Sequence, residues 1–283
     1  MCGTWYMSEE LISETVTFSG SNGMNIEGYL VRPKVNERRP AVIIIHEIWG
    51  LVDHIKDVAD RLAAQGYVAL APDLYSESRE LKSILTADNI RTAWSFMQTL
   101  PTNRRADTAF VQSELSKQPA DRREALQKVM STLFGGGLPK DRLVNHLVKA
   151  VDYLNSMEYV RQGRVGSVGF CFGGGMSINL ACRADLAACT VFYGENPDPI
   201  DLVKSINCPV LGLYGGEDDR INGNLDRLVA AMVKYRKTDL EIKIYPGAPH
   251  AFFNDSNRTT YREPAARDAW KRVIDFYGRT LMK

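Results

Sequence analysis

A cysteine stands between two glycines at the point where an apolar strand-like run changes into a helical pattern. The sequence Gly169-Phe-Cys171-Phe-Gly173 follows the run 164–170 and opens a glycine-rich segment. This G-x-C-x-G arrangement is a cysteine version of the nucleophile elbow, a strained turn that needs small residues two positions away on either side. It would place the thiol at a helix N-terminus, whose dipole favours a thiolate. A buried structural cysteine is the alternative from this motif alone, whereas the glycine signatures of phosphate-binding loops are absent from the sequence.

A carboxylate and a histidine follow downstream, in the chain order that this kind of site requires. Asp218 and His250 each lie in a loop directly after an apolar strand-like run. The histidine would activate the thiol as a general base, and the carboxylate would hold its tautomer and orientation. Asp219 is an alternative acid, but Asp218 is favoured because Ile221 can anchor this loop in the core. A lone loop histidine is often only a packed residue; the three residue types together predict a Cys-His-Asp triad.

The loop after the apolar run 41–45 offers further groups for the same site. The amide of Ile48 is expected to form an oxyanion hole with the amide of Phe172, the residue after the nucleophile. Glu47 is either a catalytic carboxylate or a strand-end carboxylate that faces water. His46 is interpreted as structural or as a donor to a neighbouring group, because no H-E-x-x-H or similar pair accompanies it. We therefore expect no metal and no cofactor.

The elements that must position these residues alternate between strand and helix patterns. Strands are predicted over 11–18, 24–31, 41–45, 67–71, 164–170, 188–193, 209–214 and 240–245. Helices are predicted over 53–65, 140–157, 172–183, 222–235 and 262–282. The continuous β-branched run 41–45 is typical of a parallel strand buried on both faces, and Gly66 suits a helix C-terminus. The alternation predicts an α/β fold with a mostly parallel central sheet flanked by helices.

One long segment breaks this alternation. From Ser76 to Lys140 the chain is polar, charged and helical in pattern, contains no strand candidate and carries three glycines at 135–137 near its end. Because the α/β alternation resumes at once, we interpret the whole chain, 1–283, as a single domain with a helical insertion at about 76–140 that could form a cap.

Composition excludes several classes of function. The 283 residues are 45% hydrophobic and carry a formal net charge of +1, which argues against broad nucleic-acid binding because phosphate contact needs a concentrated basic face. No apolar run has the length of a membrane span, and the N-terminus lacks a secretory pattern, although Met1 and Met7 are both candidate starts. Five cysteines without paired spacing (one of them Cys2) fit a reducing compartment. We therefore expect a cytoplasmic protein without nucleic-acid or membrane partners.

Several of these segments together resemble the dienelactone hydrolase (carboxymethylenebutenolidase) family of the α/β-hydrolase superfamily. The matching segments are His46-Glu-Ile-Trp-Gly50, Ala71-Pro-Asp-Leu-Tyr75, Gly169-Phe-Cys-Phe-Gly-Gly174, Gly215-Gly-Glu-Asp218 and His250-Ala-Phe252. The resemblance spans roughly residues 10–76 and 140–280 and leaves the insertion uncovered. It implies the α/β-hydrolase fold and a hydrolase of carboxylic esters or lactones, such as a dienelactone.

The resemblance also implies a role for individual residues. Cys171 would attack the carbonyl and form a thioester that water then hydrolyses. Glu47 would contact the cysteine in the resting state and take its proton when substrate displaces that contact. Tyr75 would assist near the oxyanion or the substrate, and Trp49 would contact the substrate. Arg79 is either a ligand for a substrate carboxylate or an ordinary surface arginine.

Two departures from the family pattern concern the substrate. Family members that cleave dienelactone have an arginine four residues after the histidine, which helps to bind the substrate carboxylate; here that residue is Asn254. The insertion could also change the shape of the pocket. A general short-chain carboxylesterase or thioesterase, and a catalytically silent ligand-binding homologue, therefore remain alternatives. The sequence leaves open whether the chain is a monomer or a homodimer.

Overall fold

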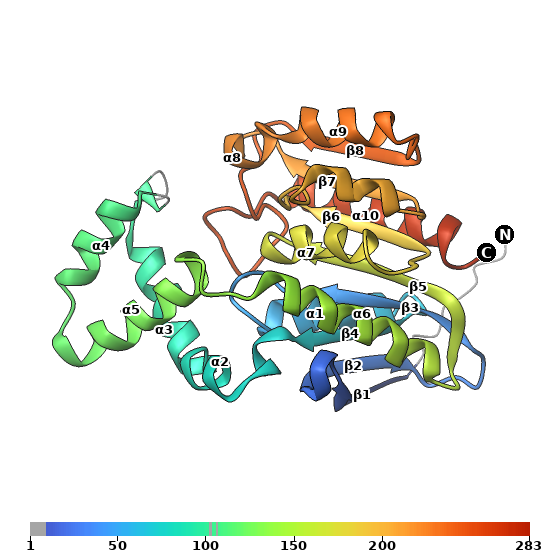
Figure 1. The fold of residues 1–283 in the computed structure, drawn as a ribbon, viewed down its shortest axis with the longest axis horizontal. Helices are drawn as coiled ribbons and strands as arrows, with labels where there is room; N and C mark the ends of the chain where they lie inside the picture. The colour runs from blue at the N-terminus through green and yellow to red at the C-terminus, as the bar shows by residue number, and fades with distance from the viewer. Residues whose placement is uncertain (1–9, 102–103, 106) are drawn as a thin grey trace, which may run out of the picture.

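An eight-stranded sheet forms the centre of the molecule (Figure 1). The structure is a computed structural model that describes residues 10–101, 104–105 and 107–283; Met1, Cys2 and Met7 lie outside these residues. The strands are β1 (Leu11–Ser19), β2 (Asn25–Pro33), β3 (Arg39–Ile45), β4 (Val68–Asp73), β5 (Val160–Phe170), β6 (Ala188–Phe192), β7 (Val210–Gly215) and β8 (Leu240–Tyr245).

Strand order places the later strands side by side in a parallel block. The order is β1-β2-β4-β3-β5-β6-β7-β8, in which β1 and β2 form an antiparallel hairpin, β2 is antiparallel to β4, and all other neighbours are parallel. The β-branched run of β3 is completely buried between β4 and β5, as a strand covered on both faces requires.

Helices cover both faces of the sheet. On one face lie α6 (Lys140–Ser156), α7 (Phe172–Ala181) and α9 (Leu225–Lys234), and on the other lie α1 (Asp53–Ala63) and α10 (Glu263–Thr280). The short α8 (Asp219–Asn222) precedes α9. Each helix buries an apolar stripe against the sheet. The helices on the two faces thus form two separate hydrophobic cores, one on each side of the sheet. None of the helices in the described ranges is long and apolar enough to cross a membrane.

Within the described residues, four α-helices lie between β4 and α6, where the sequence predicts the insertion. They are α2 (Arg79–Ile84), α3 (Ala87–Thr99), α4 (Thr108–Ser116) and α5 (Ala120–Phe134), and they project to one side of the sheet (Figure 1). Three of them begin at a side-chain cap, because Ser78, Thr86 and Asp107 each accept a hydrogen bond from the backbone N–H three residues on.

The predicted elements are confirmed, and the differences lie at their ends. Strand β5 begins at Val160 rather than Arg164, because Val160 pairs with Arg39 across an irregularity in the ladder. The helix predicted over 222–235 is α9, which begins at Leu225 because the separate short helix α8 ends at Asn222. Gly66 has a φ of 92° after α1, as a helix C-terminus favours.

Candidate active site

The cysteine elbow has the backbone geometry that its sequence predicts. Cys171 has a φ of 56° between the end of β5 and the start of α7, a conformation that side chains rarely adopt. A Cβ atom added to Gly169 would overlap the carbonyl of Gly173, and one added to Gly173 would overlap the carbonyl of Ile45. The turn therefore cannot form with larger residues at these positions, and it holds the half-buried Cys171 at the N-terminus of α7.

The three predicted triad residues come together at one edge of the sheet. The strands that precede them, β5, β7 and β8, belong to the parallel block, so their carboxyl ends share that edge. His250 Nδ1 lies 2.5 Å from Asp218 Oδ2, and the Cys171 side chain is close enough to the imidazole to raise its pKa. Asp218 is buried, whereas the neighbouring Asp219 is exposed. Of the two candidate acids, Asp218 is therefore the one that contacts the histidine.

The charges around His250 keep its ring protonated. Burial alone lowers the pKa of the imidazole, but the Cys171 and Asp218 side chains together outweigh it and raise the pKa to about 10. At neutral pH the ring is therefore an imidazolium, with one N–H directed to Asp218 and the other available to the sulfur.

The other described cysteines are in a different environment. Cys182, Cys189 and Cys208 are buried and form no disulfide. Burial raises the pKa of Cys182 to about 12 and that of Cys189 to about 11, and it raises the pKa of Cys208 as well. Because the thiolate is the reactive form, these three thiols are inert at neutral pH.

The loop after β3 lies beside the elbow and is fixed by two buried side chains. His46 Nδ1 donates to the Glu47 carbonyl at 2.6 Å, and its Nε2 accepts from the Leu74 amide at 3.3 Å. Both ring nitrogens are thus used within the protein, which makes His46 a structural residue. The Tyr75 hydroxyl donates to the Ile48 carbonyl at 2.7 Å.

Two backbone amides at this edge have no acceptor. Within the described ranges, neither the Ile48 N–H nor the Phe172 N–H donates a hydrogen bond to a protein atom. Unpaired amides are uncommon in folded proteins unless water or a ligand accepts from them. These are the two amides that the sequence assigns to an oxyanion hole.

Glu47 makes a contact that was not predicted. Its side chain is buried, and its Oε2 accepts a hydrogen bond from Asn254 Nδ2 at 2.6 Å. The Asn254 carbonyl oxygen in turn accepts from the Ser256 amide and hydroxyl, which fixes the orientation of the amide group. Glu47 Oε1 is buried without a hydrogen-bond partner among the described residues. In this structure the hydrogen-bond partner of Glu47 is thus Asn254, whereas Cys171 acts on His250, whose pKa it raises.

The three predicted substrate residues lie in different environments. Tyr75 is buried, and burial, with the nearby Asp73 and Cys171, raises the pKa of its hydroxyl well above 10. Trp49 is half-buried next to the oxyanion loop. Arg79 is exposed at the first residue of α2, and the ion pairs of the described residues do not include it. The structure therefore places Tyr75 and Trp49 at the loop beside Cys171, and the role of Arg79 stays a prediction.

Tyr193 is a residue of the site that sequence reasoning missed. It follows β6 at the same edge, has a φ of 39°, and its ring lies 5.0 Å from that of His250. The side chain is completely buried. Its position in the sequence could have indicated it. A polar side chain directly after a strand of the parallel block lies at the same edge of the sheet as the triad.

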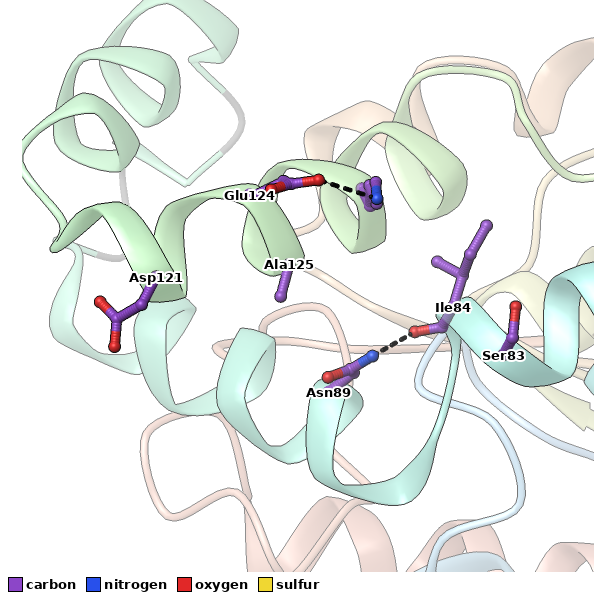
Figure 2. Close-up of a pocket in the computed structure, with 7 residues that line it drawn as sticks. Ser83, Ile84, Asn89, Asp121, Glu124 and Ala125 are labelled. Atoms are coloured by element: carbon purple, nitrogen blue, oxygen red, sulfur yellow. Dashed lines mark hydrogen bonds and ion pairs between the residues drawn. The ribbon is translucent and has the colours of Figure 1, made fainter.

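Two cavities are lined by residues other than the triad. One, of about 330 Å³, opens between α2, α3 and α5 (Figure 2). It is lined by Ser83, Ile84, Asn89, Asp121, Glu124, Ala125 and Lys128. Its polar groups are largely used within the protein, since Asn89 donates to the Ile84 carbonyl and Lys128 pairs with Glu124. The other, of about 340 Å³, lies beside α8 around Glu195 and Arg220, which form an ion pair. In the described part of the chain, no three His, Cys, Asp or Glu side chains gather as metal ligands would.

Known proteins resemble this chain over almost its whole length. The model of the "Dienelactone hydrolase family" matches residues 26–281. A Saccharolobus solfataricus protein named "Putative carboxymethylenebutenolidase" is 40% identical over 269 residues, which cover 94% of this chain and 98% of that protein. "Protein usf" of Aquifex pyrophilus is 30% identical, with 92% of this chain and 96% of that protein covered. Among solved structures, a "Putative Dienelactone Hydrolase" from Klebsiella pneumoniae superposes with a TM-score of 0.69 at 25% identity, covering 95% of this chain and 99% of that one.

Proposed function

This chain belongs to the dienelactone hydrolase family, and from that premise we propose that it cleaves its substrate through a Cys171–His250–Asp218 triad and a thioester intermediate. It has the α/β-hydrolase fold and is a hydrolase of carboxylic esters or lactones. The observation that carries the proposal is the chain of contacts from Asp218 through His250 to Cys171 at the elbow.

The first half of the reaction forms the thioester. The Cys171 sulfur attacks the substrate carbonyl carbon, and the electron pair of the C=O bond moves to oxygen. The Ile48 and Phe172 amides, which have no protein acceptor, donate to this oxyanion. When the tetrahedral intermediate collapses, the bond to the alcohol oxygen breaks, and the His250 imidazolium donates its proton to that oxygen.

The second half returns the enzyme to its starting state. The neutral His250 accepts a proton from water, whose oxygen attacks the thioester carbonyl. Collapse of the second tetrahedral intermediate releases the carboxylic acid and the Cys171 thiolate. Asp218 holds the imidazole in one orientation throughout. Glu47 provides a second carboxylate, and its unpartnered Oε1 is the atom available to take the proton from the thiol form of Cys171, which generates the thiolate that attacks.

An ester or lactone without a carboxylate is a better candidate substrate than a dienelactone. The specific observation is the contact between Asn254 and Glu47. A neutral amide occupies the position of the family's carboxylate-binding arginine, and it faces a buried carboxylate. A negatively charged group on the substrate would therefore meet Glu47 without an arginine at position 254 to compensate it.

The test combines activity with thiol labelling. We expect the wild type to hydrolyse at least one of p-nitrophenyl acetate, a dienelactone and an acyl thioester, and Cys171→Ala to lose this activity by about 10³-fold or more. Iodoacetamide at neutral pH should modify Cys171, abolish activity and spare the buried Cys208. Cys208→Ala is the matched control and should be inactivated like the wild type. Full activity in Cys171→Ala, or in alkylated protein, would refute the mechanism and favour the binding-protein alternative.

A further inference from the structure

Three aromatic side chains from distant parts of the sequence meet beside the oxyanion loop. The Trp49 ring contacts that of Trp94 edge-on, with 5.1 Å between centroids and 84° between planes, and that of Phe134, with 5.8 Å and 66°. Trp94 lies on α3, and Phe134 is the last residue of α5. We call Trp49, Trp94 and Phe134 the aromatic cluster.

The cluster is joined directly to the reaction centre. Trp49 follows Ile48, whose amide is the proposed oxyanion donor and whose carbonyl accepts from Tyr75. Gly50, on the other side of Trp49, has a φ of 80°, and a Cβ there would lie 3.2 Å from the Tyr75 ring and 3.4 Å from the Ile90 side chain of α3. Helix α3 therefore packs closely against the loop, and the insertion faces the site.

An ion-pair network around one buried carboxylate holds the two ends of the insertion together. Glu77, at the start, is completely buried and receives hydrogen bonds from Arg142 at 2.6 and 2.7 Å and from His146 at 3.1 Å. Both partners lie on α6, which follows the insertion. His146 Nδ1 in turn accepts from the Ser21 amide at 3.0 Å. Because both ends are fixed to the core, Trp94 and Phe134 have a defined place relative to Trp49.

Part of the aromatic cluster is left open to solvent. Phe134 is 53% exposed, and among the exposed large hydrophobic side chains of the described ranges it is the aromatic one. Trp49 and Trp94 are half-buried. In the described part of the chain, no Lys or Arg lies over any of the three rings. An uncovered, uncharged aromatic surface next to a reaction centre fits an apolar ligand group and not an ionic one.

We propose that the aromatic cluster binds an uncharged apolar group of the ester substrate, so that the insertion sets substrate specificity. This inference rests on the proposed function, because the ligand is a substrate of the Cys171 site. The apolar group is either the acyl chain or the alcohol of the ester, and the two series of substrates below distinguish them.

The experiment measures how kcat/KM rises as the acyl chain or the alcohol of the ester is lengthened. One series holds the alcohol constant, as p-nitrophenyl acetate, butyrate and hexanoate; the other holds the acyl group constant, as methyl, butyl and hexyl acetate. We expect kcat/KM of the wild type to rise about two- to threefold per methylene in one series. In Phe134→Glu we expect the total rise to shrink to about threefold or less, because a carboxylate replaces the open ring. Phe134 is half-exposed, so the substitution creates no core cavity.

The matched control is Phe110→Ala, at another half-buried phenylalanine of the insertion, which stacks on Arg104 instead of on the cluster. It should keep the wild-type dependence on chain length. The proposal is overturned if Phe134→Glu keeps the full dependence, if Phe110→Ala loses it equally, or if neither series of the wild type responds to length.

A binding measurement separates this proposal from the mechanism. In Cys171→Ala, 2-octanone should change the tryptophan fluorescence at concentrations at which 2-butanone does not. Adding Phe134→Glu to that variant should raise the half-saturating 2-octanone concentration by about fivefold or more. Equal binding in the two variants would overturn the aromatic site. Loss of the cysteine mechanism alone would leave this result unaffected.

Discussion

Replacing Asp218 by asparagine tests the triad through its acid, and the neighbouring Asp219 provides a matched control. Asparagine has nearly the volume of aspartate, so Asp218→Asn removes a charge from a buried position without creating a cavity. The contact at stake is the 2.5 Å approach of Oδ2 to His250 Nδ1. The exposed Asp219 undergoes the same chemical change one residue away.

The expected loss follows from two effects. A hydrogen bond to a charged group contributes about 1.5–3 kcal/mol, which corresponds to about 10- to 150-fold in rate. The amide can also donate to Nδ1 and so favour the wrong tautomer of His250, which raises the total loss to as much as about 10⁴-fold. We therefore expect kcat of Asp218→Asn to fall by about 10²- to 10⁴-fold.

The pH profile should change as well. Burial lowers the pKa of His250, while Cys171 and Asp218 raise it to about 10. The imidazolium that protonates the leaving group exists below this pKa and is lost above it. Activity of the wild type should therefore decline near pH 10. In Asp218→Asn one of the two raising charges is gone, so the decline should move to lower pH.

The assay is kcat/KM for butyl acetate, whose alkoxide leaving group needs the proton from His250, between pH 6 and 11, corrected for the uncatalysed reaction, for both variants and the wild type. Asp219→Asn should stay within about threefold of the wild type at every pH, as expected for an exposed side chain. If Asp219→Asn were the impaired variant, or if the alkaline limb of Asp218→Asn did not move, the assignment of the acid would be wrong.

Two further predictions concern stability. Asn254→Leu should lower the free energy of unfolding, measured by urea denaturation, by about 2 kcal/mol, because buried Glu47 loses its hydrogen-bond donor. Adding Glu47→Leu to this variant should restore part of the lost stability. If it restores none, the pairing of the two residues is contradicted. Arg142→Met should cost about 3 kcal/mol, because Glu77 stays buried with one partner fewer. Arg91→Met, which breaks an exposed pair, should change stability by less than about 1 kcal/mol, and an equal loss in both arginine variants would refute the argument.

The gathering of Cys171, His250 and Asp218 at one edge of the sheet was predictable because its signals are local. An elbow needs glycines at fixed positions around Cys171, and the acid and the histidine each follow a recognisable strand. Parallel strands bring their carboxyl ends to one edge, so the order of the strands along the sheet did not have to be known. The family resemblance found in these motifs is confirmed by the match over residues 26–281.

The contacts around the triad were not predictable in the same way. Nothing in the sequence near Glu47 indicates that its partner is Asn254, 207 residues away. The aromatic cluster joins a loop to two insertion helices, and its formation depends on how α3 and α5 pack. Helical periodicity places Trp94 on a helix, but it does not say which surface that helix covers. Long-range side-chain pairs of this kind depend on tertiary packing, to which a single sequence gives little access.

The Glu77 network has a consequence for how proteins of this architecture can diverge. Because Arg142 and His146 fix both ends of the insertion to the core, the distance that the intervening chain must bridge does not depend on its sequence or length. Lengthening such a loop costs little in closure entropy. Mutation can therefore remodel helices α2 to α5, and the ligands they admit, while the elbow and its partners stay unchanged. The network thus keeps the geometry of the core constant while the insertion that it anchors varies in sequence and length.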